Sequence, residues 1–286
     1  MTSGNNAMKL KIGRIAYTNL FPIFYGLERM QKRASGKNAA SYEFIDGVPS
    51  ELNLKIRTGE IDISPSSSIE YLKNRVHYRL IEGHSISSFG PVRSVLLFSK
   101  QPLEALEGRT VLTSWQSETS VALLSIILKK FYGIDAKLSS TPRSITESIT
   151  RSTGAAMKTH DAYLLIGDDA MKEALQWPRE KIYDLGDLWY RHTGLPAVFA
   201  LWIARTACCE QNPELLGQFI RDLEASKRAA RGSLEEIAGH SWLRQLIPVK
   251  ELVAYWEGIS YDFLDEHRRG LELFRSYAVE LGLIQD

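Results

Sequence analysis

Short apolar runs alternate with segments of helical periodicity along the chain as far as Ile203. The runs at 10–16, 61–63, 110–113 and 162–166 are rich in Ile, Leu and Val and have the length of buried strands. They are followed by segments in which apolar residues recur every three or four positions, as on the buried face of a helix. Alternation of this kind builds β-α-β units, so we predict an α/β protein with mainly parallel sheets.

Capping and breaking residues bound several of the predicted helices. The segment 49–56 is predicted to be a helix ended by a nearby glycine, and Ser67 followed by Glu70 fits a capping box that starts another helix. A helix over 119–131 carries an apolar stripe that we assign to the core. The segment 86–91, rich in Ser, Gly and Pro, is predicted to be a turn.

Hydroxyl, amide and acidic side chains gather directly after the predicted strands. Ligands of parallel α/β sheets bind at the carboxyl ends of the strands, and the N–H groups at helix starts favour anions there. Ser and Thr also cap ordinary helices, so each loop alone has a structural explanation, and it is their convergence that favours a carboxylate or phosphate site. The positions concerned are Asn19, 64–68, Ser87, Ser88, 114–120 and Asp168.

The charge balance argues against nucleic acid and membrane surfaces as partners. Lys and Arg total 35 against 34 Asp and Glu, a net charge of +1, so no basic field would attract an anionic polymer or lipid. No apolar stretch has the length of a membrane span, the longest being 197–204, and residues 1–12 lack the apolar run of a secretory signal. We therefore expect a cytoplasmic protein with a small-molecule partner, and the choice between monomer and homodimer stays open.

The sequence has no motif for a metal or a cofactor. The histidines form no i,i+4 pair, and the adjacent Cys208 and Cys209 make a poor ligand set. The glycine-rich signatures of dinucleotide and phosphate-binding loops are missing, as is the GxSxG nucleophile elbow. His84 and His192 fall in predicted loops, where a histidine is more often exposed to solvent than a general base. We predict no metal and no cofactor.

The chain contains, in this order, the segments IGRIAYTNLFPIFYGL, GVPSELN, GEIDISPSSSIEYL, SISSFGPVRSVLLFS, TSVALL, LLIGDDAM and TGLPAVFALW. In order and spacing they resemble chorismate dehydratases, the first enzymes of the futalosine route to menaquinone, over about residues 11–205. That family is similar in fold to type II periplasmic binding proteins, which have two lobes and a central cleft. The resemblance implies a discontinuous first lobe, 8–98 plus 204–286, a second lobe, 99–203, and chain crossings near Ser99 and Ile203.

The resemblance also implies a reaction and a set of site residues. Chorismate would lose water to give 3-[(1-carboxyvinyl)oxy]benzoate, a hydro-lyase reaction without metal or cofactor. Asn19 and Ser87 would be catalytic, and no matched residue is an obvious strong base, so the substrate's own carboxylate is a plausible proton acceptor. Substrate-binding roles are implied for Ser67, Ser68, Ser88, Thr119, Ser120 and Asp168.

Two other functions stay open at the level of the sequence. One is 1,4-dihydroxy-6-naphthoate synthase of the same pathway, which shares the fold but usually opens with a Pro-Asn-Asp type of motif that is absent here. The other is a cytoplasmic small-carboxylate-binding protein without catalysis, because the two-lobed fold mostly captures solutes.

Overall fold

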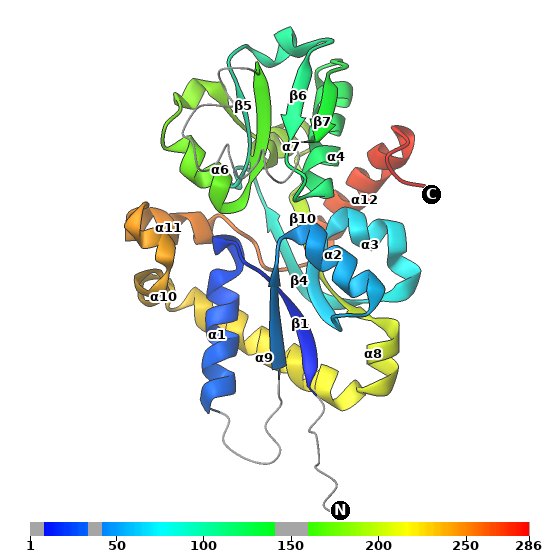
Figure 1. The fold of residues 1–286 in the computed structure, drawn as a ribbon, viewed down its shortest axis with the longest axis vertical. Helices are drawn as coiled ribbons and strands as arrows, with labels where there is room; N and C mark the ends of the chain where they lie inside the picture. The colour runs from blue at the N-terminus through cyan, green and yellow to red at the C-terminus, as the bar shows by residue number, and fades with distance from the viewer. Residues whose placement is uncertain (1–8, 34–41, 141–159, 286) are drawn as a thin grey trace, which may run out of the picture.

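The computed structural model describes residues 9–33, 42–140 and 160–285, which form two lobes, each built on a five-stranded sheet (Figure 1). The predicted two-lobed α/β architecture is confirmed. The first sheet has the order β2 (Tyr42–Gly47), β1 (Leu10–Ile15), β3 (Ile63–Ser67), β10 (Ala197–Arg205), β4 (Tyr78–Ser88). The second has the order β7 (Lys137–Ser140), β6 (Thr110–Thr113), β8 (Ala162–Ile166), β5 (Val95–Ser99), β9 (Ile182–Asp184).

Each sheet combines parallel strands with one strand that runs the opposite way. β1 is parallel to β2 and β3, and β6 is parallel to β7 and β8. β10 is antiparallel to β3 and β4, and β5 is antiparallel to β8 and β9, so the prediction of mainly parallel sheets is only partly right. The reason is that β5 and β10 enter their sheets from the other lobe. They start at the edge where the parallel strands end, and must therefore run away from it.

The chain crosses between the lobes at other positions than we expected. β5 already belongs to the second sheet, and β10 belongs to the first. The crossings therefore lie within 89–94 and 194–196 rather than near Ser99 and Ile203. The apolar runs of β5 and β10 look like any buried strand, so the sequence gives no sign of which sheet each one joins.

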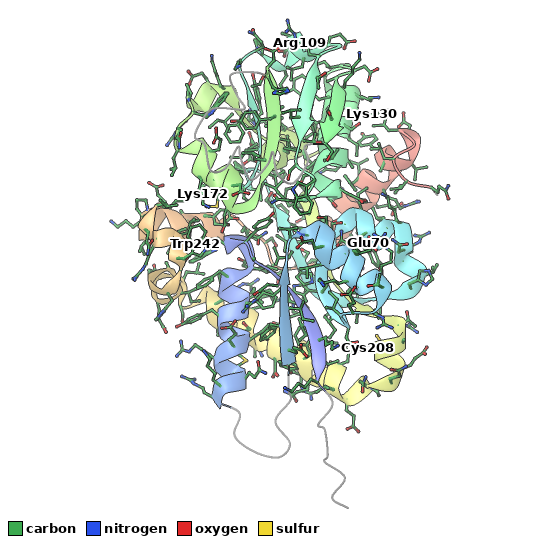
Figure 2. All side chains as sticks on the ribbon, viewed as in Figure 1. Glu70, Arg109, Lys130, Lys172, Cys208 and Trp242 are labelled. Carbon is green, nitrogen blue, oxygen red and sulfur yellow. The ribbon has the colours of Figure 1, made fainter. Side chains whose placement is uncertain are left out.

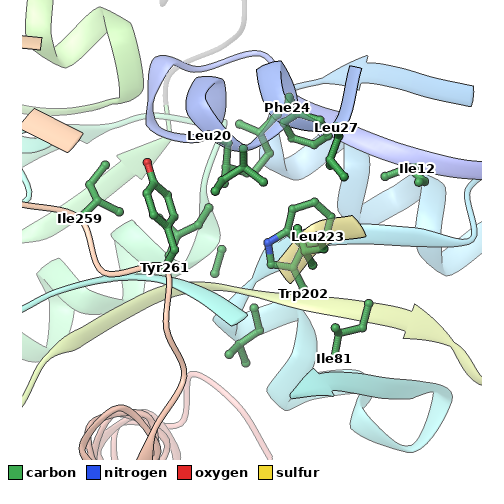
Figure 3. Close-up of a cluster of buried hydrophobic side chains, with 14 of the residues drawn as sticks. Ile12, Leu20, Phe24, Leu27, Ile81, Trp202, Leu223, Ile259 and Tyr261 are labelled. Carbon is green, nitrogen blue, oxygen red and sulfur yellow. The ribbon is translucent and has the colours of Figure 1, made fainter. Parts of the chain in front are cut away.

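Helices cover the first sheet and build its core. Figure 3 shows part of this core, with Trp202 beside Phe24. The ring of Trp202 lies 5.8 Å from that of Phe24 in the helix Phe21–Arg33 and 5.7 Å from that of Phe219 in the helix Pro213–Arg231. Burying each such ring stabilises the lobe by roughly 2–3 kcal/mol. The predicted helix 49–56 is confirmed and ends at Gly59, whose φ is +85°. The helices are α1 (Phe21–Arg33), α2 (Pro49–Thr58), α3 (Ser68–Asn74), α8 (Thr206–Gln211), α9 (Pro213–Arg231), α10 (Leu234–His240) and α11 (Val249–Glu257).

The second lobe has its own apolar core, to which the end of the chain returns. Its helices are α4 (Glu118–Ile126), α6 (Gly167–Ala174) and α7 (Leu185–Thr193), and a wider π-type turn, Ile127–Phe131, continues α4. Phe274 and Ala278 of the last helix, α12 (Asp265–Glu280), are buried in this core, and α12 contacts α4 and β10. The range 204–286, which we assigned to the first lobe, therefore also contributes to the second.

The predicted turn at 86–91 is wrong for its first part, because β4 continues to Ser88. β10 pairs with β4 along one edge and Ser260 bridges Ser87 on the other, so tertiary pairing outweighs the weak strand propensity of the serines. Short 3-10 turns complete the described chain at Thr18–Leu20, Arg75–His77, Leu103–Leu106, Arg179–Lys181 and Trp242–Gln245. Among the described residues, no helix combines the length and the apolar character needed to cross a membrane.

Candidate functional site

A small cavity of about 50 Å³ lies between the lobes, where the ends of the parallel strands of both sheets face each other. The first lobe contributes the loop after β1 and the strand ends beside α3, and the second contributes the starts of α4 and α6. The lining residues are Ile15, Tyr17, Asn19, Pro49, Ser67, Ile86, Val92, Ser94, Val95, Ser117, Ser120, Ile166, Gly167, Phe199 and Ala200.

A larger hollow of about 520 Å³ lies over α4 and includes Lys73, Glu118 and Lys129 in its lining. Lys73 Nζ and Glu118 Oε2 pair with each other at 2.8 Å. We take the smaller cavity as the candidate site, because its residues Tyr17 and Asn19 carry buried polar atoms that have no partner among residues 9–33, 42–140 and 160–285.

Asn19 lies on the 3-10 turn Thr18–Leu20, directly after β1, and lines the cavity as predicted. Its Oδ1 atom is buried and has no hydrogen-bond partner within the described ranges. A buried acceptor left unpaired costs about 1–3 kcal/mol, so such an atom calls for an explanation such as a ligand. The amide group both donates and accepts, so it can pair with a polar ligand in the cavity.

The backbone of this turn is held from both lobes. The hydroxyl of Tyr261 donates to the Asn19 carbonyl at 2.6 Å, and the indole N–H of Trp256 donates to the Thr18 carbonyl at 2.8 Å. The N–H of Thr18 donates to Asp168 Oδ1 at 2.8 Å across the cleft. The turn thus has little freedom to move when the lobes are closed.

Tyr17 is a site residue that the sequence analysis missed. Its hydroxyl is buried without a partner in the described part of the chain, and its ring packs so closely on Gly167 that a Cβ there would lie 2.7 Å from the ring. Burial, followed by the negative charges of Asp169, Asp168 and Glu51, raises the pKa of Tyr17 well above its usual 10. Tyr17 is therefore a neutral donor. The only signal in the sequence was an aromatic residue directly after a buried strand, which also fits an ordinary core position.

Hydroxyl groups from both lobes line the rest of the cavity. Ser117 caps α4 by accepting the Ser120 N–H at 3.2 Å, and the two Oγ atoms lie 3.0 Å apart. From the first lobe, Ser67 caps α3 by accepting the Glu70 N–H at 3.3 Å and also accepts from Asn53 Nδ2 at 2.8 Å. The structure therefore brings the predicted Ser67 and Ser120 to the cavity. Hydroxyl donors near a helix start suit a carboxylate.

Two other predicted hydroxyl residues, Ser68 and Thr119, are not among the cavity-lining residues. Ser68 Oγ donates to the Val198 carbonyl at 2.6 Å, which joins α3 to β10 inside the first lobe. Thr119 Oγ1 accepts the N–H of Ile69 at 3.0 Å, which joins α4 to α3 across the lobes. Both side chains thus serve the framework of the site.

Ser87 and Ser88 also have partners within the framework. Ser87 Oγ donates to the Ser260 carbonyl at 3.2 Å and lies 3.0 Å from Ser85 Oγ. Ser88 Oγ donates to the Gly90 carbonyl at 2.8 Å. Neither side chain lines the cavity. The motif placed these serines beside the site, but strand orientation decides which of them face it.

Asp168 joins the lobes and does not line the cavity. Its Oδ1 accepts the Thr18 N–H at 2.8 Å, and its Oδ2 accepts from Thr18 Oγ1 at 3.2 Å. Burial raises the pKa of Asp168 to about 6, although both hydrogen bonds from Thr18 act to lower it. Other contacts across the cleft are Ser50 N–H to the Gln116 carbonyl at 3.1 Å and Lys172 Nζ 4.7 Å from the ring centre of Trp242 (Figure 2).

The two loop histidines of the sequence analysis do not supply a base. His84 is buried in β4, contrary to the prediction of an exposed loop residue, and burial, followed by the charge of Lys227, lowers its pKa to about 4. His192 lies on α7 and stacks on Phe131 at 4.6 Å between ring centres. Apart from Tyr17, no described residue that lines the cavity has an ionisable side chain. No group of three His, Cys, Asp or Glu that could hold a metal occurs in the described ranges.

The family model for menaquinone biosynthesis matches residues 10–280. A chorismate dehydratase of Thermus thermophilus is 31% identical over an alignment of 289 positions that covers 95% of each chain. A chorismate dehydratase of Campylobacter jejuni is 26% identical over 215 residues, 75% of this chain and 74% of that one.

Solved structures of similar fold include a protein from Archaeoglobus fulgidus, AF1704, with a TM-score of 0.75, 17% identity and coverage of 98% of this chain and 100% of that one. The periplasmic aliphatic sulphonate binding protein SsuA of Escherichia coli has a TM-score of 0.68 and 13% identity, with 97% and 94% covered. At these identities the likeness concerns the fold alone.

Proposed function

The chain belongs to the menaquinone-biosynthesis family, and we propose that it is an enzyme that eliminates water from chorismate to give 3-[(1-carboxyvinyl)oxy]benzoate. In class it would be a carbon-oxygen hydro-lyase. Two relatives named chorismate dehydratase support the reaction. Within the site, the observation that carries the proposal is a cavity in which apolar residues alternate with neutral hydroxyl and amide groups, with no carboxylate, imidazole or amine among the described lining residues.

The chemistry of the reaction suits a neutral site. The proton at C3 of chorismate is vinylogous to the ring carboxylate through C1=C2, so its removal gives a delocalised dienolate. Departure of the C4 hydroxyl then makes the ring aromatic, which drives the reaction, and the proton and hydroxyl leave as one water. The protein must hold two carboxylates and supply a donor to the leaving hydroxyl.

The lining residues divide these tasks. Ser117 and Ser120 would hold one carboxylate at the start of α4, where the helix favours negative charge. Tyr17 and Ser67 would donate to the other carboxylate from the first lobe. The amide of Asn19 would face the C4 hydroxyl, donating through Nδ2 as the hydroxyl departs.

The proton at C3 would go to the substrate itself. Because Tyr17 has its pKa raised and is the only described lining residue that ionises, the described lining of the cavity offers no side chain that accepts a proton near neutral pH. The enolpyruvyl carboxylate of chorismate is attached through the oxygen on C3 and can reach that proton. The site would then act by orientation and charge stabilisation.

Incubation of purified, EDTA-treated protein with chorismate tests the proposal, with products followed by chromatography and mass detection. We expect a product lighter by one water in which the enolpyruvyl ether is retained. A heat-inactivated sample controls for spontaneous breakdown of chorismate. If the folded protein gives no such product, the proposed function is wrong.

The likeness in fold to SsuA supports a second candidate, a small-carboxylate-binding protein without catalysis. For that function, chorismate would raise the melting temperature and remain unchanged. A cytoplasmic location is part of the proposal for the enzyme. It is checked by fractionating cells that contain the protein and following the activity.

A further inference from the structure

The segment that follows α11 lies along the outer edge of β4. Ser87 N–H donates to the Ser260 carbonyl at 3.0 Å, and Ser260 N–H donates back to the Ser87 carbonyl at 2.8 Å. Ser85 N–H donates to the Tyr261 carbonyl at 3.1 Å. These backbone bonds fix the register of the segment on the first sheet, so the position of Tyr261 is set by β4.

Side chains tie the same segment down on either side of Tyr261. Ser87 Oγ donates to the Ser260 carbonyl, and Ser85 Oγ donates to the Asp262 carbonyl at 2.5 Å. The carboxylate of Asp262 accepts from the buried Lys227 Nζ at 3.0 Å. The residues before and after Tyr261 are thus both fixed by side-chain hydrogen bonds.

Tyr261 connects this fixed segment to the turn that lines the cavity. Its ring is buried in the core of the first lobe together with Leu20 and Ile259 (Figure 3). Its hydroxyl donates to the Asn19 carbonyl at 2.6 Å, so this phenol supports the turn that carries Asn19, whose Oδ1 has no partner in the described part of the chain. Tyr261 is not a lining residue of the cavity, so any effect it has on a substrate is indirect.

We propose that Tyr261 is a positioning residue that holds the Asn19 amide against the reacting part of the substrate, and that Ser85 and Ser87 anchor it there. The inference rests on the proposed function, in which Asn19 contacts chorismate. A displacement of about 1 Å can cost a hundredfold in rate when a catalytic group must be oriented. In this arrangement Ser87 affects turnover through Tyr261 and not by contact with the substrate.

Steady-state kinetics with chorismate for Tyr261→Phe, Asn19→Ala and the double variant test this role. Tyr261→Phe keeps the buried ring and removes only the donor to the turn. We expect kcat to fall by at least about tenfold with KM changed less than about threefold. In the Asn19→Ala background the same change should alter kcat by less than about twofold, because the group being positioned is gone.

Tyr42→Phe is the matched control. It also removes a buried hydroxyl bonded at 2.6 Å, in this case to Asp222 Oδ2, at the far end of the first lobe. It should lower the melting temperature without lowering kcat. Ser87→Ala is a second variant in case Tyr261→Phe folds poorly, with a smaller fall in kcat that likewise vanishes in the Asn19→Ala background.

The outcomes separate this inference from the proposed function. If the wild type does not dehydrate chorismate, both are wrong. If the wild type is active but Tyr261→Phe keeps its kcat, or loses as much in the Asn19→Ala background as alone, Tyr261 does not position Asn19. If Tyr42→Phe lowers kcat equally, loss of stability explains the effect and the inference is overturned.

Discussion

At the scale of single residues, the candidate site is marked by two buried polar atoms that have no hydrogen-bond partner in the described part of the chain. Asn19 Oδ1 and the Tyr17 hydroxyl are buried without partners in the described residues, whereas most other polar side chains nearby have one. Burial without a partner is unfavourable for the free protein, and a ligand that pairs with these atoms recovers that free energy on binding. Substrate binding and orientation are therefore expected to depend on these two side chains.

Asn19→Ala should lower kcat for chorismate by about a hundredfold or more, because it would remove the proposed donor to the departing hydroxyl. Steady-state kinetics measure the effect. Asn74→Ala is a suitable control, since Asn74 Nδ2 donates to Glu70 Oε1 at 3.0 Å away from the cavity. Turnover by Asn19→Ala within a few-fold of the wild type would contradict the role assigned to this amide.

Ser120→Ala should act on binding instead. A hydrogen bond to a charged group is worth about 1.5–3 kcal/mol, so we expect KM to rise about tenfold or more with kcat nearly unchanged. Ser125→Ala makes the same change in a buried residue of the same helix that does not line the cavity. Equal KM values for the two variants would show that Ser120 does not hold a carboxylate.

The residues found from the sequence and those missed differ for a physical reason. Motif and strand-end position bring Asn19, Ser67 and Ser120 to the cavity, because the carboxyl ends of parallel strands meet there. Ser68 and Thr119 are adjacent in sequence to cavity residues, but their hydroxyls bond to the framework. A one-residue step changes the face that a side chain occupies, and the sequence does not give that face without the register.

At the scale of elements, the start of α6 is the point where the second lobe contacts the loop after β1. Gly167 begins this helix with a φ of +60°, and its N–H donates to the Ser94 carbonyl at 2.7 Å. The ring of Tyr17 occupies the space that a Cβ would need. Only glycine therefore allows β8 to turn into α6 against this ring.

Gly167→Ala should lower kcat/KM for chorismate by more than about tenfold, because the new methyl group displaces Tyr17 from the cavity. Gly194→Ala separates this contact from backbone strain. Gly194 has a similar φ, +67°, but nothing lies within 4 Å of its would-be Cβ. Both variants should lose about 1 kcal/mol of stability from strain, while kcat/KM falls only in the first. The idea fails if the two lose kcat/KM alike.

Asp168 in the first turn of α6 makes stability depend on pH. Its pKa of about 6 lies above the ordinary 3.8, so its contribution to folding is fully present below about pH 3.8 and is lost as pH rises through 6. Asp168→Asn cannot ionise, yet it can accept the Thr18 N–H and donate to Thr18 Oγ1. We expect the melting temperature of Asp168→Asn minus that of the wild type to increase from pH 4 to pH 7. Thermal melts at both pH values check this, and a constant difference would contradict it.

Helices were predictable where the sequence signals for their starts and ends agreed. Strands were missed where pairing with a distant segment determines the conformation. The helix after Gly47 and the cap at Ser67 follow from proline, glycine and capping-box residues alone. The long β4 strand was missed because its last residues are serines, and their strand conformation depends on β10 and on Ser260, remote in sequence. The directions of β5 and β10 depend on the lobe from which each strand comes, which no local pattern records.

At the scale of the whole molecule, the cavity is too small for the proposed substrate to enter without lobe movement. A volume of about 50 Å³ holds a few waters at roughly 10–15 Å³ each, not a ring with two carboxylate groups. Each lobe has a core of its own, so the lobes can separate without unfolding. Opening must break the contacts that cross the cleft, among them Thr18 to Asp168 and Ile69 to Thr119.

Thr119→Val tests whether such a contact sets the balance between open and closed lobes. Valine has the shape of threonine but cannot accept the Ile69 N–H, which is then unpaired when the lobes are closed and hydrated when they open. The loss, about 1 kcal/mol, should raise KM for chorismate by several-fold, because binding is coupled to closure. The melting temperature should change little.

Ser68→Ala is the control, because it breaks the bond to Val198 within one lobe. It should lower the melting temperature and leave KM unchanged. Small-angle scattering should show a larger radius of gyration for Thr119→Val than for Ser68→Ala. If the two variants have the same radius and the same KM, the hydrogen bond between α3 and α4 does not control closure.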